Sequence, residues 1–184
     1  MSDNISISKE DSLLLQSWSS ASMIGHLSNS VFLKSDLYSN LPLSNLQRWT
    51  IDHSGIGNPA MMQMTLYALL VIPKEILSTD TKEYHRIEHT FNIYASYLAE
   101  SGTASTYKNE QDLKEINYYK HIRNSVSHSR CEYYGSDPEF FVHFLDSYQG
   151  EECHIRMRCN NVGKLLDQLS KIMELYLFQK YRKE

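Results

Sequence analysis

An arginine, an asparagine and a histidine lie close together in the sequence Arg-Asn-Ser-Val-Ser-His, residues 123–128. The planar fork of an arginine binds a phosphate group, and a histidine transfers protons near neutral pH. These two side chains are the minimum set for cleaving RNA without a metal ion. The candidate catalytic residues are therefore Arg123, Asn124 and His128, with no metal at their site.

The segment that carries these residues has the apolar spacing of a helix. Apolar side chains recur every three to four residues along one face: Leu113, Ile116, Tyr119, Ile122 and Val126. On an uninterrupted helix, Arg123 and His128 would be separated by roughly 140°. The helix must therefore end within residues 125–127 if they are to converge in one chain. Alternatively, the pair converges with its copy in a second subunit.

Basic and aromatic residues surround the candidate site. Residues 120–130 contain five basic side chains and no aspartate or glutamate, and two tyrosines follow. Such a cationic and aromatic segment suits a phosphate chain and its bases. The residues predicted to contact RNA are Lys120, His121, Arg130 and Tyr133.

The same arginine–histidine spacing occurs a second time, at Arg48 and His53. This copy falls in a glycine-containing stretch that we expect to be irregular, without a helix to place the arginine. Context rather than spacing therefore favours residues 123–128. The alternative is that Arg123 is an ordinary surface residue and His128 merely ends a helix.

The rest of the chain predicts an all-α protein, a four- to five-helix bundle with a small β-hairpin before the C-terminal helix. We expect one domain over residues 1–184, with residues 1–8 as a flexible tail. Residues 38–58 read as an irregular loop, and the hairpin strands as 140–145 and 153–159. Residues 9–36 are expected to form one long helix or two stacked ones. The other helices are expected at about 60–72 with an end or kink at Pro73, at 82–100 after a cap at 79–81, and from a cap at Asn160 or Asn161 onward.

Composition is that of an ordinary globular protein, with 41% hydrophobic and 22% charged residues among 184. A net charge of −4 argues against a strongly basic nucleic-acid coat but not against a local basic site. The three cysteines form no C-x-x-C, so neither a disulfide framework nor a cysteine zinc site is expected. Without a signal-like N-terminus or a long apolar run, we expect a cytoplasmic protein with no membrane span.

Two further histidine pairs could do chemistry. His85-Arg-Ile-Glu-His89 spells an inverted zinc-peptidase motif, although a solvated helix face explains it more simply. His143 and His154 lie on the two expected strands, and a polar pair across the hairpin is a simpler interpretation than a metal site.

The segment 122–128 resembles the signature of the HEPN superfamily, R-x(4–6)-H with a polar residue after the arginine. A compact helical arrangement with the signature near the end of a central helix is similar too. The resemblance implies a metal-independent endoribonuclease that works as a homodimer and leaves a 2′,3′-cyclic phosphate. In it, His128 is the general base or acid, Arg123 holds the scissile phosphate, and Asn124 orients His128 or binds phosphate.

The resemblance also implies a biological role, as a toxin or in defence against phage, with an antitoxin protein as a candidate partner. The antitoxin-paired branch carries a tyrosine two residues after the histidine, where this chain has Arg130. Pairing with such an antitoxin is therefore in doubt. Because some family members are inactive, the alternative function is a silent dimeric module that binds RNA or a partner protein.

Overall fold

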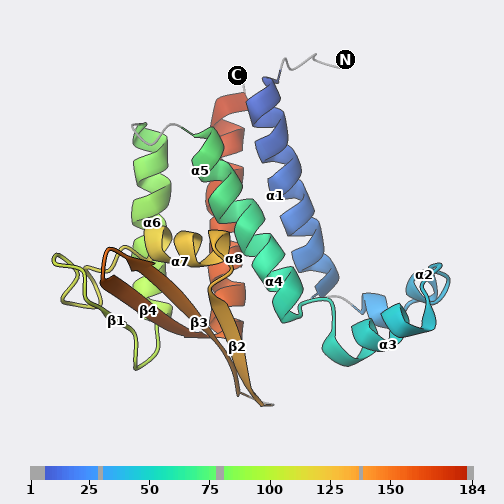
Figure 1. Ribbon diagram of the computed structural model, residues 1–184. Helices are drawn as coiled ribbons and strands as arrows, with labels where there is room; N and C mark the ends of the chain where they lie inside the picture. The colour runs from blue at the N-terminus through green and yellow to red at the C-terminus, as the bar shows by residue number, and fades with distance from the viewer. Residues whose placement is uncertain (1–6, 29–30, 78–80, 137–138, 182–184) are drawn as a thin grey trace.

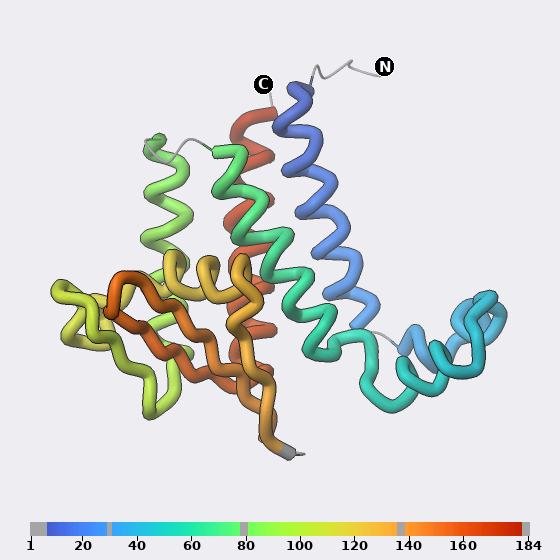
Figure 2. The backbone as a smooth tube through the Cα atoms, viewed as in Figure 1, coloured from blue at the N-terminus to red at the C-terminus, as the bar shows by residue number. Residues whose placement is uncertain are grey.

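The computed structural model describes residues 7–28, 31–77, 81–136 and 139–181. Long helices form its main layer (Figures 1 and 2). They are α1 (Lys9–Ser28), the continuous segment α4 (Pro59–Leu66), η2 (Tyr67–Val71) and α5 (Ile72–Ile76), then α6 (Lys82–Leu98) and α8 (Cys159–Tyr181). Helix α8 packs against both α1 and α6, so the C-terminal helix joins the first half of the chain to the second.

A shorter helix, α7 (Tyr118–Ser127), lies across these helices and packs against β3, η2 and α6 (Figure 1). The antiparallel sheet beside it has the order β1-β4-β3-β2. Its strands are β1 (Ala104–Ser105), β2 (Cys131–Ser136), β3 (Glu139–Tyr148) and β4 (Glu151–Arg158). The buried side chains of β3 and β4 alternate with exposed or half-buried ones, so one face of the sheet belongs to the core.

The predicted hairpin before the last helix is confirmed by β3 and β4, which pair from Phe141↔Arg158 to Tyr148↔Glu151. The description as an all-α bundle is too narrow, however, because β2 and β1 extend the hairpin on both sides. Strand β2 follows α7 directly and pairs with β3 along its whole length. The protein is mostly helical, but it combines its helices with a four-stranded sheet.

The stretch 38–58, predicted to be an irregular loop, contains the end of the short helix α2 (Asp36–Ser39) and the helix α3 (Asn45–Ser54). Another short helix, η1 (Phe32–Lys34), precedes it. Ser44 and Gln47 form a reciprocal capping box that begins α3, a local signal that outweighs the turn-forming residues around it. The predicted first helix accordingly ends at Ser28 rather than near residue 36. Helices α2 and α3 extend away from the long helices (Figure 1).

Pro73 does not end the central helix, which continues to Ile76. A proline has no N–H to donate and crowds the preceding turn. Here the preceding turn is the π-helical segment η2, whose wider i→i+5 bonds include Ile72 N–H to Tyr67 O. The cap at Asn58 is confirmed, because its side chain accepts a hydrogen bond from Met61 N.

The remaining helix ends agree in part with expectation. Thr81 caps α6 as predicted, whereas residues 79 and 80 of that cap lie outside the described residues. Helix α8 begins at Cys159, directly after β4, so Asn160 and Asn161 lie in its first turn rather than before it. The side chain of Asn161 instead donates to Leu98 O at the end of α6. Most of the expected N-terminal tail, residues 1–6, also lies outside the described residues.

Membrane-spanning potential is weak in the part of the chain that the structure describes. No single helix there has both the length and the apolarity to cross a bilayer, and α3 with the α4–α5 segment passes only as a pair bent by 81°.

A buried carboxyl group ties the first helix to the last. Asp11 accepts a hydrogen bond from Lys180 Nζ at 2.8 Å and another from the Tyr181 hydroxyl, and only 8% of its side chain is exposed. Burial alone would raise the pKa of the Asp11 carboxyl, but these hydrogen bonds outweigh burial and hold that pKa below its ordinary value.

We expect Asp11→Asn to lower the free energy of unfolding by about 1 kcal/mol at pH 7. Because the folded pKa of Asp11 is depressed, the wild-type advantage is present above the unfolded value near 4 and disappears as pH falls through the folded value. Urea unfolding of both proteins between pH 7 and pH 3 measures this difference. A difference that stays constant over that range would contradict the assignment.

Candidate functional site

Side chains from α6 fix the start of α7. Asn117 caps the helix by accepting from Lys120 N, and its Nδ2 donates to Glu88 Oε1 at 2.8 Å. Asn92 Oδ1 accepts from Tyr119 N at 2.7 Å. The helix therefore begins at Tyr118, later than the apolar spacing from Leu113 predicts, and Leu113 is 43% exposed instead of lying on the core face.

The end of α7 is set by a Schellman turn. Ser129 adopts a left-handed conformation (φ 55°), Ser129 N donates to Val126 O at 3.2 Å, and Arg130 N donates to Ser125 O at 2.8 Å. The helix ends at Ser127, within the interval that convergence of the candidate residues requires, and His128 is its C-cap. The chain then passes directly into β2.

The guanidinium of Arg123 is held by its neighbour Asn124. Asn124 Oδ1 accepts from Arg123 Nη2 at 2.7 Å and from Nε at 3.2 Å. The amide nitrogen of Asn124 donates in turn to Asp146 Oδ2 on β3 at 2.9 Å. Asn124 therefore orients the arginine, and no hydrogen bond joins its side chain to the His128 ring in the described residues. Its predicted contact with phosphate stays a prediction.

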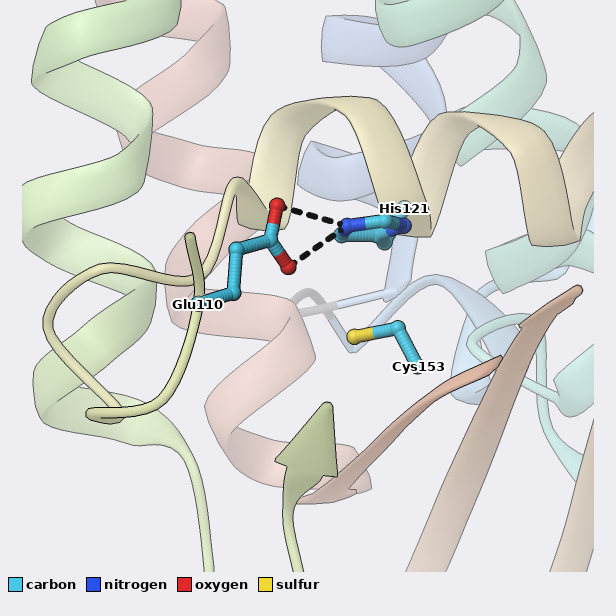
Figure 3. A group of neighbouring side chains, drawn as sticks. All are labelled: Glu110, His121 and Cys153. Carbon is cyan, nitrogen blue, oxygen red and sulfur yellow. Dashed lines mark hydrogen bonds and ion pairs between the residues drawn. The ribbon is translucent and has the colours of Figure 1, made fainter. Parts of the chain in front are cut away.

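Behind Asn124 lies a buried histidine between two carboxylates. His121 Nδ1 is 2.7 Å from Asp146 Oδ2, and Nε2 lies 2.9 and 3.0 Å from the two carboxylate oxygens of Glu110 (Figure 3). Burial raises the pKa of Asp146, but hydrogen bonds from His121 and Asn124 outweigh this and lower it overall. Both ring nitrogens of His121 therefore face carboxylate oxygens, Nδ1 that of Asp146 and Nε2 those of Glu110.

The side chain of His128, unlike that of Arg123, is not held by a neighbouring side chain in the described part of the chain. Its side chain is exposed and makes no hydrogen bond with any residue that the structure describes. Over the same residues, no hydrogen bond joins the His128 imidazole to the Arg123 guanidinium. Helix α7 thus carries an oriented guanidinium near its middle and, at its C-cap, an imidazole that is open to solvent.

The four residues predicted to contact RNA occupy different environments. Arg130 is exposed, with Nη1 donating to the Ser147 hydroxyl at 3.0 Å, and half-buried Lys120 has its ammonium 4.8 Å from the Tyr107 ring centre. Tyr133 is half-buried against the core with its hydroxyl enclosed. The prediction for His121 is corrected: its side chain has no exposed surface, so it positions other groups and does not touch RNA.

Sequence reasoning missed the two acidic residues of this network. Asp146 follows the alternation of Val142 and Phe144 on the inward face of β3, and a carboxylate at an inward position was a usable signal. Glu110 lies in the connection between β1 and α7, where the sequence offers no pattern that marks it. Both lie outside residues 120–130, the segment chosen for its lack of acidic residues.

The competing motifs have simpler explanations in the structure. Arg48 does lie on a helix, contrary to expectation, but its guanidinium donates to the carbonyls of Tyr38, Ser39 and Leu41. The residues of the inverted zinc-peptidase pattern, His85 and His89, are exposed on α6, as the surface interpretation predicts.

The histidine pair of the sheet lies where it was expected. His143 Nε2 lies 3.1 Å from His154 Nδ1, which confirms the predicted polar pair across the hairpin.

Comparison with known families agrees with the resemblance in the motif. Residues 20–180 match the family model described as HEPN pEK499 p136. Because the match covers most of the chain, the protein belongs to this family, and it has a HEPN-type domain. Neither the curated proteins nor the solved structures contain a significant match.

We expect Ser129→Gly to raise the free energy of unfolding by about 1 kcal/mol, because glycine adopts the left-handed conformation without the steric cost that serine bears. The matched control is Ser127→Gly in the last helical turn, which should lower stability by about 0.5 kcal/mol. Chemical denaturation of the three proteins measures both changes. Loss of stability in Ser129→Gly would contradict the described helix end.

We expect Asp146→Ala to lower the free energy of unfolding by about 3 kcal/mol, since it leaves the buried His121 ring and the Asn124 amide without their shared acceptor. Asp167→Ala is the control, because Asp167 forms an exposed ion pair with Lys171 and should change stability by less than about 0.5 kcal/mol. Equal effects in the two variants, measured by denaturant midpoint, would show that the buried network is not formed.

Proposed function

We propose that this HEPN-family protein is a metal-independent endoribonuclease of the toxin or phage-defence kind that acts as a homodimer on RNA. In the reaction, a ribose 2′-oxygen loses its proton to a base and forms a bond to the adjacent phosphorus. The bond from phosphorus to the 5′-oxygen breaks, and that oxygen takes a proton from an acid. The products are a 2′,3′-cyclic phosphate and a 5′-hydroxyl.

The contrast between Arg123 and His128 is the observation that carries this proposal. Asn124 orients the Arg123 guanidinium, which leaves donors that Asn124 does not occupy for a phosphate. A cation oriented before the substrate arrives stabilises the charge that develops on the phosphoryl oxygens. His128 is exposed at the same helix end, where it can exchange protons with bound RNA.

The need for two proton-transfer groups supports the homodimer. One histidine cannot be base and acid at once on opposite sides of a phosphorus atom, and each chain offers one His128. Two α7 ends that face each other would supply a base from one subunit and an acid from its partner. Each Arg123 would then lie near the phosphate between them.

The surroundings of α7 suggest how the RNA is held. Arg130 and Lys120 offer positive charge near the helix, and half-buried Tyr133 is the aromatic residue proposed to contact a base. Because Arg130 occupies the position of the modifiable tyrosine in the antitoxin-paired branch, any antitoxin would neutralise this protein by a route other than modifying that tyrosine.

We expect the purified protein to cleave single-stranded RNA with added EDTA present. The expected rates fall by about 100-fold or more in His128→Ala and in Arg123→Ala, which lose proton transfer and phosphate stabilisation respectively. Gel analysis of end-labelled RNA, followed by phosphatase and cyclic-phosphate end-group assays, measures both the rate and the chemistry.

His53→Ala is the matched control, since His53 is also exposed and lies five residues after an arginine on a helix. It should cleave at the wild-type rate. RNA binding without cleavage would support the silent module instead. Cleavage products with a 3′-hydroxyl and a 5′-phosphate would contradict the mechanism.

A further inference from the structure

Three side chains with metal-binding atoms meet beneath α7. They are Glu110 from the connection before the helix, His121 from the helix itself and Cys153 from β4 (Figure 3). The carboxylate oxygen, the ring nitrogen and the sulfur all lie within 4.8 Å of one another. The nuclease mechanism uses none of these atoms, so their convergence needs a separate explanation.

The atoms in this cluster match the preferences of zinc. Zn²⁺ binds imidazole nitrogen, carboxylate oxygen and thiolate sulfur, usually with four ligands in a tetrahedron, whereas Mg²⁺ and Ca²⁺ avoid sulfur. Full burial of His121 and Cys153 protects such a site from bulk water, while Glu110 keeps 11% of its side chain exposed. The carboxylate thus marks the side from which an ion and a fourth ligand would enter.

Supporting groups around the cluster are those expected of a metal site. Asp146 Oδ2 accepts from His121 Nδ1 at 2.7 Å, which directs the other ring nitrogen, Nε2, towards Glu110 and Cys153. A carboxylate behind a metal-bound histidine is the usual means of fixing the ring and its tautomer. Ser105 Oγ donates to Glu110 Oε2 at 3.0 Å and orients that carboxylate in the same way.

The distances require only a small adjustment. Zinc bond lengths place neighbouring ligand atoms about 3.3–3.7 Å apart in a tetrahedron. His121 Nε2 and the Glu110 oxygens lie at 2.9–3.0 Å and would separate slightly, while the sulfur would move inward by up to about an ångström. Rotation of the Glu110 and Cys153 side chains can supply both movements.

We propose that Glu110, His121 and Cys153 bind one Zn²⁺ ion, with a water molecule as the fourth ligand, and that this ion joins the 106–117 connection and β4 to α7. The ion would be structural: it would hold the 106–117 connection and β4 against His121, while the hydrogen bonds through Asp146 and Asn124 orient Arg123 without it. The sequence gives no hint of it, because the three ligands are separated by 11 and 32 residues and form no short motif.

Cobalt substitution tests the proposal on the full-length, tag-free protein without RNA. Co²⁺ bound to a thiolate gives sulfur-to-metal charge-transfer absorption in the near ultraviolet, and tetrahedral Co²⁺ gives intense visible bands. We expect both signals to saturate at one Co²⁺ per chain and to disappear when Zn²⁺ is added. Absence of the charge-transfer band in the wild-type protein, or its persistence beside added Zn²⁺, overturns the proposal.

Variants then assign the ligands. Cys153→Ser should abolish the charge-transfer band, and Asp146→Asn should weaken Co²⁺ binding by about 10–100-fold because it loosens His121. Cys159→Ser and His85→Ala are controls that should keep the wild-type spectrum. A band that vanishes in Cys159→Ser or survives in Cys153→Ser refutes the assignment.

One further variant covers the case in which Cys153→Ser does not fold. Glu110→Gln keeps the shape of the side chain, and it should weaken Co²⁺ binding at least about tenfold. Unchanged affinity in that variant also refutes the site. Since no RNA is present, the result is independent of the nuclease proposal.

Discussion

The buried imidazole of His121 is the constraint on which the rest of this region depends. Taking a charged group out of water costs several kcal/mol, and only well-placed partners offset that cost. Asp146 on β3 and Glu110 in the connection before α7 are those partners, and Asn124 and Ser105 donate to their oxygens. A shift of α7 against the sheet would leave a buried charge unpaired, so the network fixes the position of the helix.

The same network determines what the end of α7 presents to solvent. Orientation passes from His121 through Asp146 and Asn124 to the Arg123 guanidinium, in three hydrogen-bonded steps. The Schellman turn at Ser129 then reverses the chain, so that His128 caps the helix without entering the network. Helix α7 thus carries an oriented guanidinium within its length and an exposed imidazole at its C-cap.

Local sequence patterns predicted most of the helices and strands, but they did not predict how these elements pack against one another. The apolar spacing of α6, the cap at Asn58 and the alternation of β4 were each predicted from a few neighbouring residues. Strand β1 could not be, because it is two residues long and exists through its pairing with β4. The start of α7 was misplaced for a similar reason, since it depends on Asn92 and Glu88, residues that contact Asn117 only in the folded chain.

In the candidate site too, the sequence indicated the residues but not their surroundings. Arg123, Asn124 and His128 could be selected from their types and spacing, but the partners of His121 come from residues 110 and 146. The basic side chains of residues 120–130 were therefore all expected to face solvent, whereas the side chain of His121 is fully buried. The alternation along β3 indicates that Asp146 faces inward. A carboxylate in the core needs a buried polar partner, and His121 is the nearby imidazole that supplies it.

Two of the acidic residues near the motif do not face solvent with their carboxylates. The net charge of −4 includes Glu110 and Asp146, which lie close to the motif but direct their oxygens inward to His121, Asn124 and Ser105. The basic side chains of this segment that reach its surface are Lys120, Arg123 and Arg130, which are half-buried or exposed. At physiological salt, exposed charges more than about 8 Å apart interact little, so the potential at this surface depends on nearby side chains rather than on the net charge of the chain.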